Sequence, residues 1–208
     1  MVAAAIVFTE STPIAQSGSL RFSVTLPTSA EATAGKPNAE LVDGRLLVMT
    51  AKDPKAGEPR FQISDGASGQ LIFGMDLEGA KPGSTVTLDG SAVGFPLNSI
   101  NDIPAGTYSV QALIHKYETF TRADGHTVKL PMDRGEGQQW ARAPGNPYST
   151  PRSVTIDPKA AGTVAIKLDQ VIPPLPTISD ISGLPSQRKG RSRIQRSSGP
   201  IRPLLSAQ

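Results

Sequence analysis

The chain has 208 residues, none of them cysteine, with 20 glycines, 19 prolines and a formal net charge of +3. The absence of cysteine excludes disulfides, thiolate metal sites and a cysteine nucleophile, and the glycine and proline content argues against long helices. The charge is uneven: residues 1–178 hold 15 basic and 17 acidic residues, so the main part of the chain has no positive field that would attract nucleic acid.

The chain begins with a short apolar run, Val2–Phe8. A basic region before this run is missing, and Glu10 follows it too soon for an ordinary signal peptide. Residues 1–17 therefore have two interpretations, a clipped or degenerate signal peptide and a frayed terminus. The first predicts a secreted or periplasmic protein. No apolar run reaches about 18 residues, so no transmembrane segment is expected.

Apolar and polar residues alternate with a period of two at intervals between residues 18 and 168, which is the pattern of half-buried strands. Two continuous apolar runs, 46–49 and 71–73, suit strands that are covered on both faces. The alternating segments are 20–26, 61–63, 86–88, 108–114, 154–156 and 164–168.

Turn residues separate these segments, among them Asp43-Gly44, Asp65-Gly66 and Asp89-Gly90. About eight short strands with such turns are typical of an all-β domain. We expect an immunoglobulin-like β-sandwich over residues 18–172, with no long helix.

Residues 115–149 interrupt the alternation, and five of the ten aromatic residues of the chain lie between Tyr108 and Tyr148. We expect a long loop here, and so long a loop inside a domain is usually functional or part of an interface. Its rings either pack back onto the domain and pin the loop, or form a platform for a sugar ring or a peptide. The candidate interaction surface consists of Tyr117, Phe120, Arg122, His126, Gln139, Trp140, Arg142 and Tyr148.

Residues that carry catalysis are not arranged in a recognisable pattern. Gly66-Ala67-Ser68-Gly69 is the nearest approach to the Gly-x-Ser-x-Gly of a hydrolase, and its spacing is wrong. The two histidines, His115 and His126, lack the spacing of a helical metal site. No glycine-rich loop opens a helix. We therefore expect no catalytic residue, no cofactor and no metal.

The C-terminal region begins with Pro173-Pro174-Leu175-Pro176, which is typical of a stiff linker. Residues 179–208 hold six basic residues and one acid, with no aromatic residue. Such a composition cannot bury enough apolar surface to offset the entropy of ordering. Residues 173–208 are therefore predicted to be a linker and a disordered basic tail.

Three stretches carry a family resemblance: Glu58–Asp65 (EPRFQISD), Ile72–Asp76 (IFGMD) and Asp102–Tyr108 (DIPAGTY). Together with residues 111–140 they resemble the N-terminal region of a group of large secreted bacterial esterase-like proteins, from about Ser19 to Pro174. In those proteins a β-rich accessory domain precedes an α/β-hydrolase domain, which would hold the catalytic serine, acid and histidine.

Only 34 residues follow Pro174 here, and their Arg, Ser and Pro content is typical of a truncated or out-of-frame ending rather than of a hydrolase domain. The resemblance therefore implies a non-catalytic accessory or interaction domain, with an α/β-hydrolase domain as its partner. The alternative is a carbohydrate-binding module that uses aromatic residues of the 115–149 loop.

Overall fold

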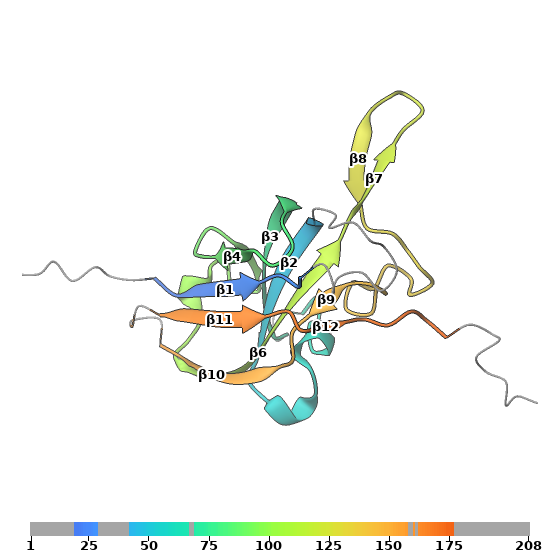
Figure 1. Cartoon of the computed structure of the whole chain (residues 1–208). Coiled ribbons are helices and arrows are strands. Elements are labelled where there is room, and N and C mark those ends of the chain that lie inside the picture. The colour runs from blue at the N-terminus through green and yellow to red at the C-terminus, as the bar shows by residue number, and fades with distance from the viewer. Residues whose placement is uncertain (1–18, 29–41, 67–68, 158–159, 161, 177–208) are drawn as a thin grey trace, which may run out of the picture. The chain divides into compact units, whose positions relative to one another are not determined.

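The computed structural model describes residues 19–28, 42–66, 69–157, 160 and 162–176 (Figure 1). The predicted signal peptide at 1–17 and the predicted tail beyond residue 176 lie outside these residues. Within them the chain is all-β, with twelve strands and three 3-10 helices of three residues each. No helix in the described part is long and apolar enough to cross a membrane.

The strands form three sheets. A small sheet has the order β11-β1-β4, a large sheet has the order β12-β9-β6-β2-β3-β5 with β10 also paired to β6, and β7 and β8 form a separate hairpin. The strands are β1 (Arg21–Thr25), β2 (Val42–Ala51), β3 (Leu71–Ala80), β4 (Thr85–Leu88), β5 (Val93–Phe95), β6 (Gly106–Lys116), β7 (Glu118–Thr121), β8 (Thr127–Leu130), β9 (Pro147–Tyr148), β10 (Arg152–Ile156), β11 (Thr163–Lys167) and β12 (Gln170–Val171), and the helices are η1 (Pro54–Ala56), η2 (Pro59–Phe61) and η3 (Ile100–Asp102).

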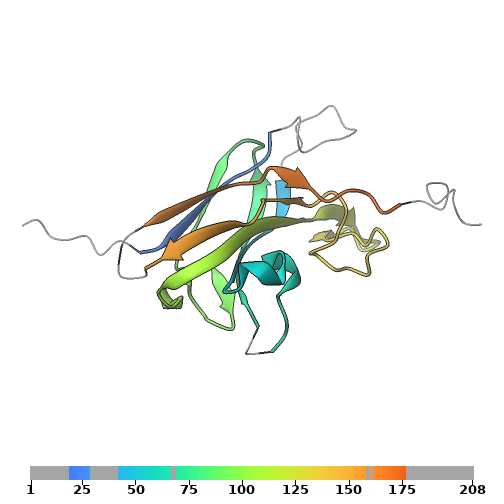
Figure 2. The ribbon, with the colours of Figure 1, turned by 90° about the horizontal axis from the view of Figure 1, so that it is seen from below.

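The small sheet and the large sheet face each other across the main core, and Figure 2 shows them as two layers. The alternation in β1 places Phe22 and Val24 in this core, where both are fully buried. From the large sheet, Leu46, Val48 and Val110 meet them. Burial of one side chain of this size contributes about 1.5–3 kcal/mol, so the period-two pattern is the main determinant of the packing.

The opposite side of the large sheet, called here the outer face, is also covered. Leu47, Met49 and Leu113 point to this side and form a second apolar cluster with Ile172. Residues 46–51 of β2 are all buried as a result. The continuous apolar run at 46–49 therefore marks a strand covered on both faces, as predicted from the sequence.

Three local predictions were wrong. The alternation at 61–63 does not form a strand, because Pro59 opens the short helix η2, which ends at Phe61. Asp43-Gly44 is not a turn between strands but lies inside β2, at a shift of register against β3. Residues 115–149 are not one long loop, because they contain the β7–β8 hairpin, which projects away from the two sheets (Figure 1).

Candidate functional site

The candidate site lies on the outer face of the large sheet, over β6 and β2. Two segments that are far apart in the sequence cover this face: η2 with the residues around it, and the stretch 140–149, which contains β9. Ile63, Trp140 and Tyr148 from these segments pack on the second apolar cluster. The site is therefore built on two long central strands of the large sheet.

Arg60 is the central residue of the site, and only 9% of it is exposed. Its Nε donates to Glu58 Oε2 at 2.8 Å, and its guanidinium also donates to the carbonyl of Ala141 at 3.1 Å. A buried guanidinium is costly unless it is paired and hydrogen-bonded. Here it links η2 to the 140–149 stretch, so Arg60 fixes one covering segment to the other.

Gln111 on β6 completes the network beneath Arg60. Its side-chain oxygen accepts from the backbone N–H of Arg60 at 3.1 Å. Its Nε2 donates to Glu58 Oε2 at 2.7 Å and to the carbonyl of Ser149 at 3.0 Å. Burying a glutamine costs little free energy when both ends of its amide are hydrogen-bonded, and such a glutamine orients the groups that it bonds. The network thus ties both covering segments to the centre of the sheet.

Aromatic rings and guanidinium groups stack above this network. The Arg60 guanidinium carbon lies 4.0 Å from the ring centroid of Tyr148 and 4.5 Å from that of Phe61. Arg142 lies on Phe61 as well, at 5.2 Å from its centroid. Phe61 remains 49% exposed. The arrangement presents an apolar ring to solvent in a position fixed by two cations.

The edge strand β5, which pairs with β3 of the same sheet, carries two exposed apolar side chains. Val93 and Phe95 are 68% and 44% exposed and pair with Gly74 and Ile72 of β3. Gly94 between them has no room for a side chain, since a Cβ there would lie 2.4 Å from the Phe73 ring. The backbone of β5 at Gly94 therefore packs directly against the Phe73 ring of the main core.

Four of the predicted interaction residues belong to this site or its margin. Tyr148 and Arg142 take part in the stack, and Trp140 is half-buried against the second apolar cluster. Gln139 is exposed, and its backbone carbonyl accepts from the N–H of Arg142 in a turn. The structure therefore brings the second half of the predicted surface to the outer face.

The other four predicted residues lie in or beside the hairpin. Tyr117 precedes β7 and makes an edge-to-face contact with His115, with ring centroids 5.7 Å apart. Phe120 is half-buried opposite Val128. Arg122 and His126 both lie 3.3 Å from the Asp124 carboxylate, near the hairpin turn.

These four are held by contacts within the hairpin and at its base. Arg60 and Phe61 are not part of the candidate surface predicted from the sequence. The available signal was Pro59, because proline is favoured at the first position of a short helix and thus marks the start of η2.

Burial lowers the pKa of His115 below its ordinary value, an effect that the nearby Glu136 carboxylate partly opposes. The neutral imidazole at the end of β6 is thus favoured in the folded chain. Among the described residues, no three His, Cys, Asp or Glu side chains lie close enough together to hold a metal ion.

Comparisons with protein-family models, with curated proteins and with solved structures find no match for this chain.

Proposed function

We propose that the chain is a non-catalytic interaction domain that binds a partner protein domain through the outer face of its large sheet. The observation that carries this proposal is the exposed Phe61 ring, which lies against the guanidinium groups of Arg60 and Arg142. Exposed aromatic residues held by arginines are typical of the energetic centres of protein interfaces. Val93 and Phe95 on the edge strand β5 of the same sheet are exposed as well.

The partner that we propose is an α/β-hydrolase domain, in a secreted or periplasmic protein. This part of the proposal rests on the sequence resemblance of residues 19–174 to the accessory region of large esterase-like proteins. The first of the resembling stretches, Glu58–Asp65, contains both Arg60 and Phe61. The resemblance and the exposed ring thus point to the same surface.

An immunoglobulin-like topology is part of this proposal. The Tyr108 hydroxyl donates to the carbonyl of Pro104 at 2.8 Å, near the start of the central strand β6. A tyrosine in this position, bonded to the backbone a few residues upstream, is a hallmark of immunoglobulin-like sandwiches. The two facing sheets agree with that assignment, and such domains commonly serve as interaction modules.

A protein partner agrees better with the geometry than a polysaccharide does. A sugar platform needs an aromatic ring with an open face. Trp140 is half-buried against the second apolar cluster, and one face of Tyr148 is covered by Arg60. Both rings serve mainly to anchor the 140–149 stretch. Phe61 is the ring that presents exposed surface at this site.

Photo-crosslinking in the native host tests the proposal. A benzoylphenylalanine at position 61 should crosslink to a chain with a Gly-x-Ser-x-Gly hydrolase motif, identified by mass spectrometry. The additional substitution Phe95→Asp should abolish the crosslink. The same probe at Thr87, exposed on β4 of the small sheet, should give no such product.

Equal crosslinking from positions 61 and 87, or a partner without a hydrolase domain, would overturn the proposal. Polysaccharide binding that is lost in Phe61→Ala and shifts the emission of Trp140, the single tryptophan, would favour a carbohydrate-binding module instead.

A further inference from the structure

The two sheets part along one side of the domain, between β10 and β11. These strands follow each other in the chain but belong to different sheets: β10 pairs with β6 of the large sheet, and β11 pairs with β1 of the small sheet. The layer between the sheets therefore opens to this side. A cleft of about 380 Å³ lies there, within the size range of small-ligand sites.

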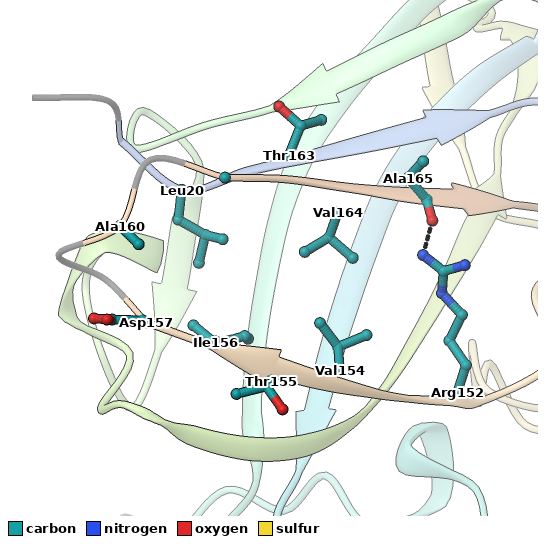
Figure 3. Close-up of a pocket in the computed structure, with 11 residues that line it drawn as sticks. Leu20, Arg152, Val154, Thr155, Ile156, Asp157, Ala160, Thr163, Val164 and Ala165 are labelled. Atoms are coloured by element: carbon teal, nitrogen blue, oxygen red, sulfur yellow. Dashed lines mark hydrogen bonds between the residues drawn. The ribbon is translucent and has the colours of Figure 1, made fainter. Parts of the chain in front are cut away.

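Apolar side chains meet across the middle of the cleft, and polar residues line other parts of it. Val154 on β10 and Val164 on β11 point toward each other across the gap, and Leu20 and Ile156 close one end (Figure 3). Directly paired residues on adjacent strands point to the same face of a sheet. Val154 pairs with the core residue Tyr108 and Val164 with the core residue Phe22, so both valines point inward. Both valines remain partly exposed, although they pack against the main core.

One cation lies at the other end of the cleft. The Arg152 guanidinium donates across the gap to the carbonyl of Ala165 on β11 (Figure 3). A guanidinium has five N–H donors, so this bond leaves donors for an anion. Arg152 is separated from Ile156 by the length of β10, about 13 Å at the usual rise per residue. The cleft therefore combines an apolar trough with a positive charge at one end.

We propose that this lateral cleft binds a medium-chain fatty acid, with its carboxylate at Arg152 and its alkyl chain along Val154 and Val164 toward Leu20. Leu20 and Ile156 close the end away from Arg152 (Figure 3), so the carboxylate lies at the Arg152 end. The alkyl chain covers apolar side chains that are otherwise partly open to water, and that burial supplies the main favourable free energy.

An added peptide strand fits the same cleft less well. A strand would pair with the open edge of β11, where the Ala165 carbonyl already accepts from Arg152. A charged side chain across a strand edge is a common device against such pairing. A fatty acid uses this arginine, whereas a strand has to displace it.

Titration of the whole chain with sodium decanoate, followed by amide chemical shifts in NMR spectra, tests the proposal. Decanoate should shift the amide signals of β10 and β11. Arg152→Gln should weaken decanoate binding by about tenfold, because a charge-assisted hydrogen bond is lost. Decanol should bind the parent chain and this variant alike. The control Arg122→Gln, in the hairpin turn, should leave decanoate binding unchanged.

A second variant, Val164→Phe, should fill the trough and abolish decanoate binding. Arg152 is exposed, so Arg152→Gln remains informative if Val164→Phe fails to fold. The proposal is wrong if decanoate causes no shifts at millimolar concentration, or if Arg152→Gln binds it as tightly as the parent. Shifts at β10 and β11 that arise only with an apolar strand-forming peptide would also overturn it, in favour of strand addition.

Discussion

Arg60 is the residue on which the outer-face site depends most. Arg60→Met removes the ion pair with Glu58, the bond to Ala141 and the contacts with Tyr148 and Phe61. Breaking a buried pair leaves its partner uncompensated, but the Glu58 side chain is 35% exposed, which reduces the penalty. We expect a loss of about 2 kcal/mol in the free energy of unfolding, measured by urea denaturation.

Arg45→Met is the matched control for Arg60→Met. Arg45 also pairs with a carboxylate, that of Asp76 at 2.9 Å, but the side chain of Arg45 is 34% exposed and that of Asp76 65%, whereas the side chain of Arg60 is 9% exposed. Exposed pairs contribute about 0.2–1 kcal/mol. Equal destabilisation by the two substitutions would show that Arg60 is no anchor.

His115 makes the stability of the domain depend on pH in a defined direction. Burial lowers its pKa from the ordinary value of 6.5, while Glu136 acts in the opposite sense. The unfolded chain therefore binds this proton more readily, and stability falls as the pH drops from about 6.5 toward the lowered value in the folded chain. Urea unfolding at pH 7.5 and pH 5.5 should show this decrease.

His115→Gln should reduce that pH dependence. Besides Glu136, His115 faces the Tyr117 ring and, across the strand pair, Arg45, which is paired with Asp76. His126→Gln, in the exposed hairpin turn, should leave the dependence as it is. An identical pH profile in His115→Gln and in the parent chain would assign the effect to other groups.

At the scale of elements, the β7–β8 hairpin is separable from the rest of the fold. None of its residues is fully buried, and its base is held by the ion pair from Lys129 to Asp43 at 3.0 Å. Replacing residues 119–129 by Asn-Gly, a favoured two-residue turn, should change the free energy of unfolding by about 1 kcal/mol or less. Thermal denaturation followed by circular dichroism measures this, and loss of the cooperative transition would contradict it.

The strands were predictable where one physical signal dominated. Period-two alternation located β1, β6 and β11, because each places one apolar face on the main core. The hairpin was missed although Asp124-Gly125 is a turn signal, because its strands expose both faces and so lack the apolar alternation of a core strand. Apolar alternation thus identifies the strands that build the core, and it does not detect a hairpin that contributes no residue to the core.

The site was harder to predict because it depends on contacts between distant residues. Arg60, Gln111 and Ser149 meet only after β6 and η2 are in place, with separations of 51 and 38 residues along the chain. Aromatic clustering singled out Trp140 and Tyr148, and both rings pack against the second apolar cluster. The role of Arg60 has no counterpart in any local pattern, since a single arginine is usually a surface residue.

At the scale of the whole molecule, the large sheet is the common support of three surfaces. Its inner side forms the main core with the small sheet, its outer side holds the Arg60 network, and its edge strand β10 borders the lateral cleft. The proposed protein partner and the proposed fatty acid use different surfaces. Each can therefore be tested by substitutions that leave the other intact.

The same arrangement predicts the order of local stability across the fold. Residues 108–114 of β6 and 46–51 of β2 are buried throughout, and each of these strands is paired on both sides. Their amide groups should open only on global unfolding. Hydrogen exchange followed by NMR should find the slowest amides in β2 and β6, intermediate rates in β1 and β4, and the fastest rates in β7 and β8. Hairpin amides as slow as those of β6 would mean that the hairpin unfolds together with the core, and amides of β1 that outlast those of β2 would place the most stable region in the small sheet instead.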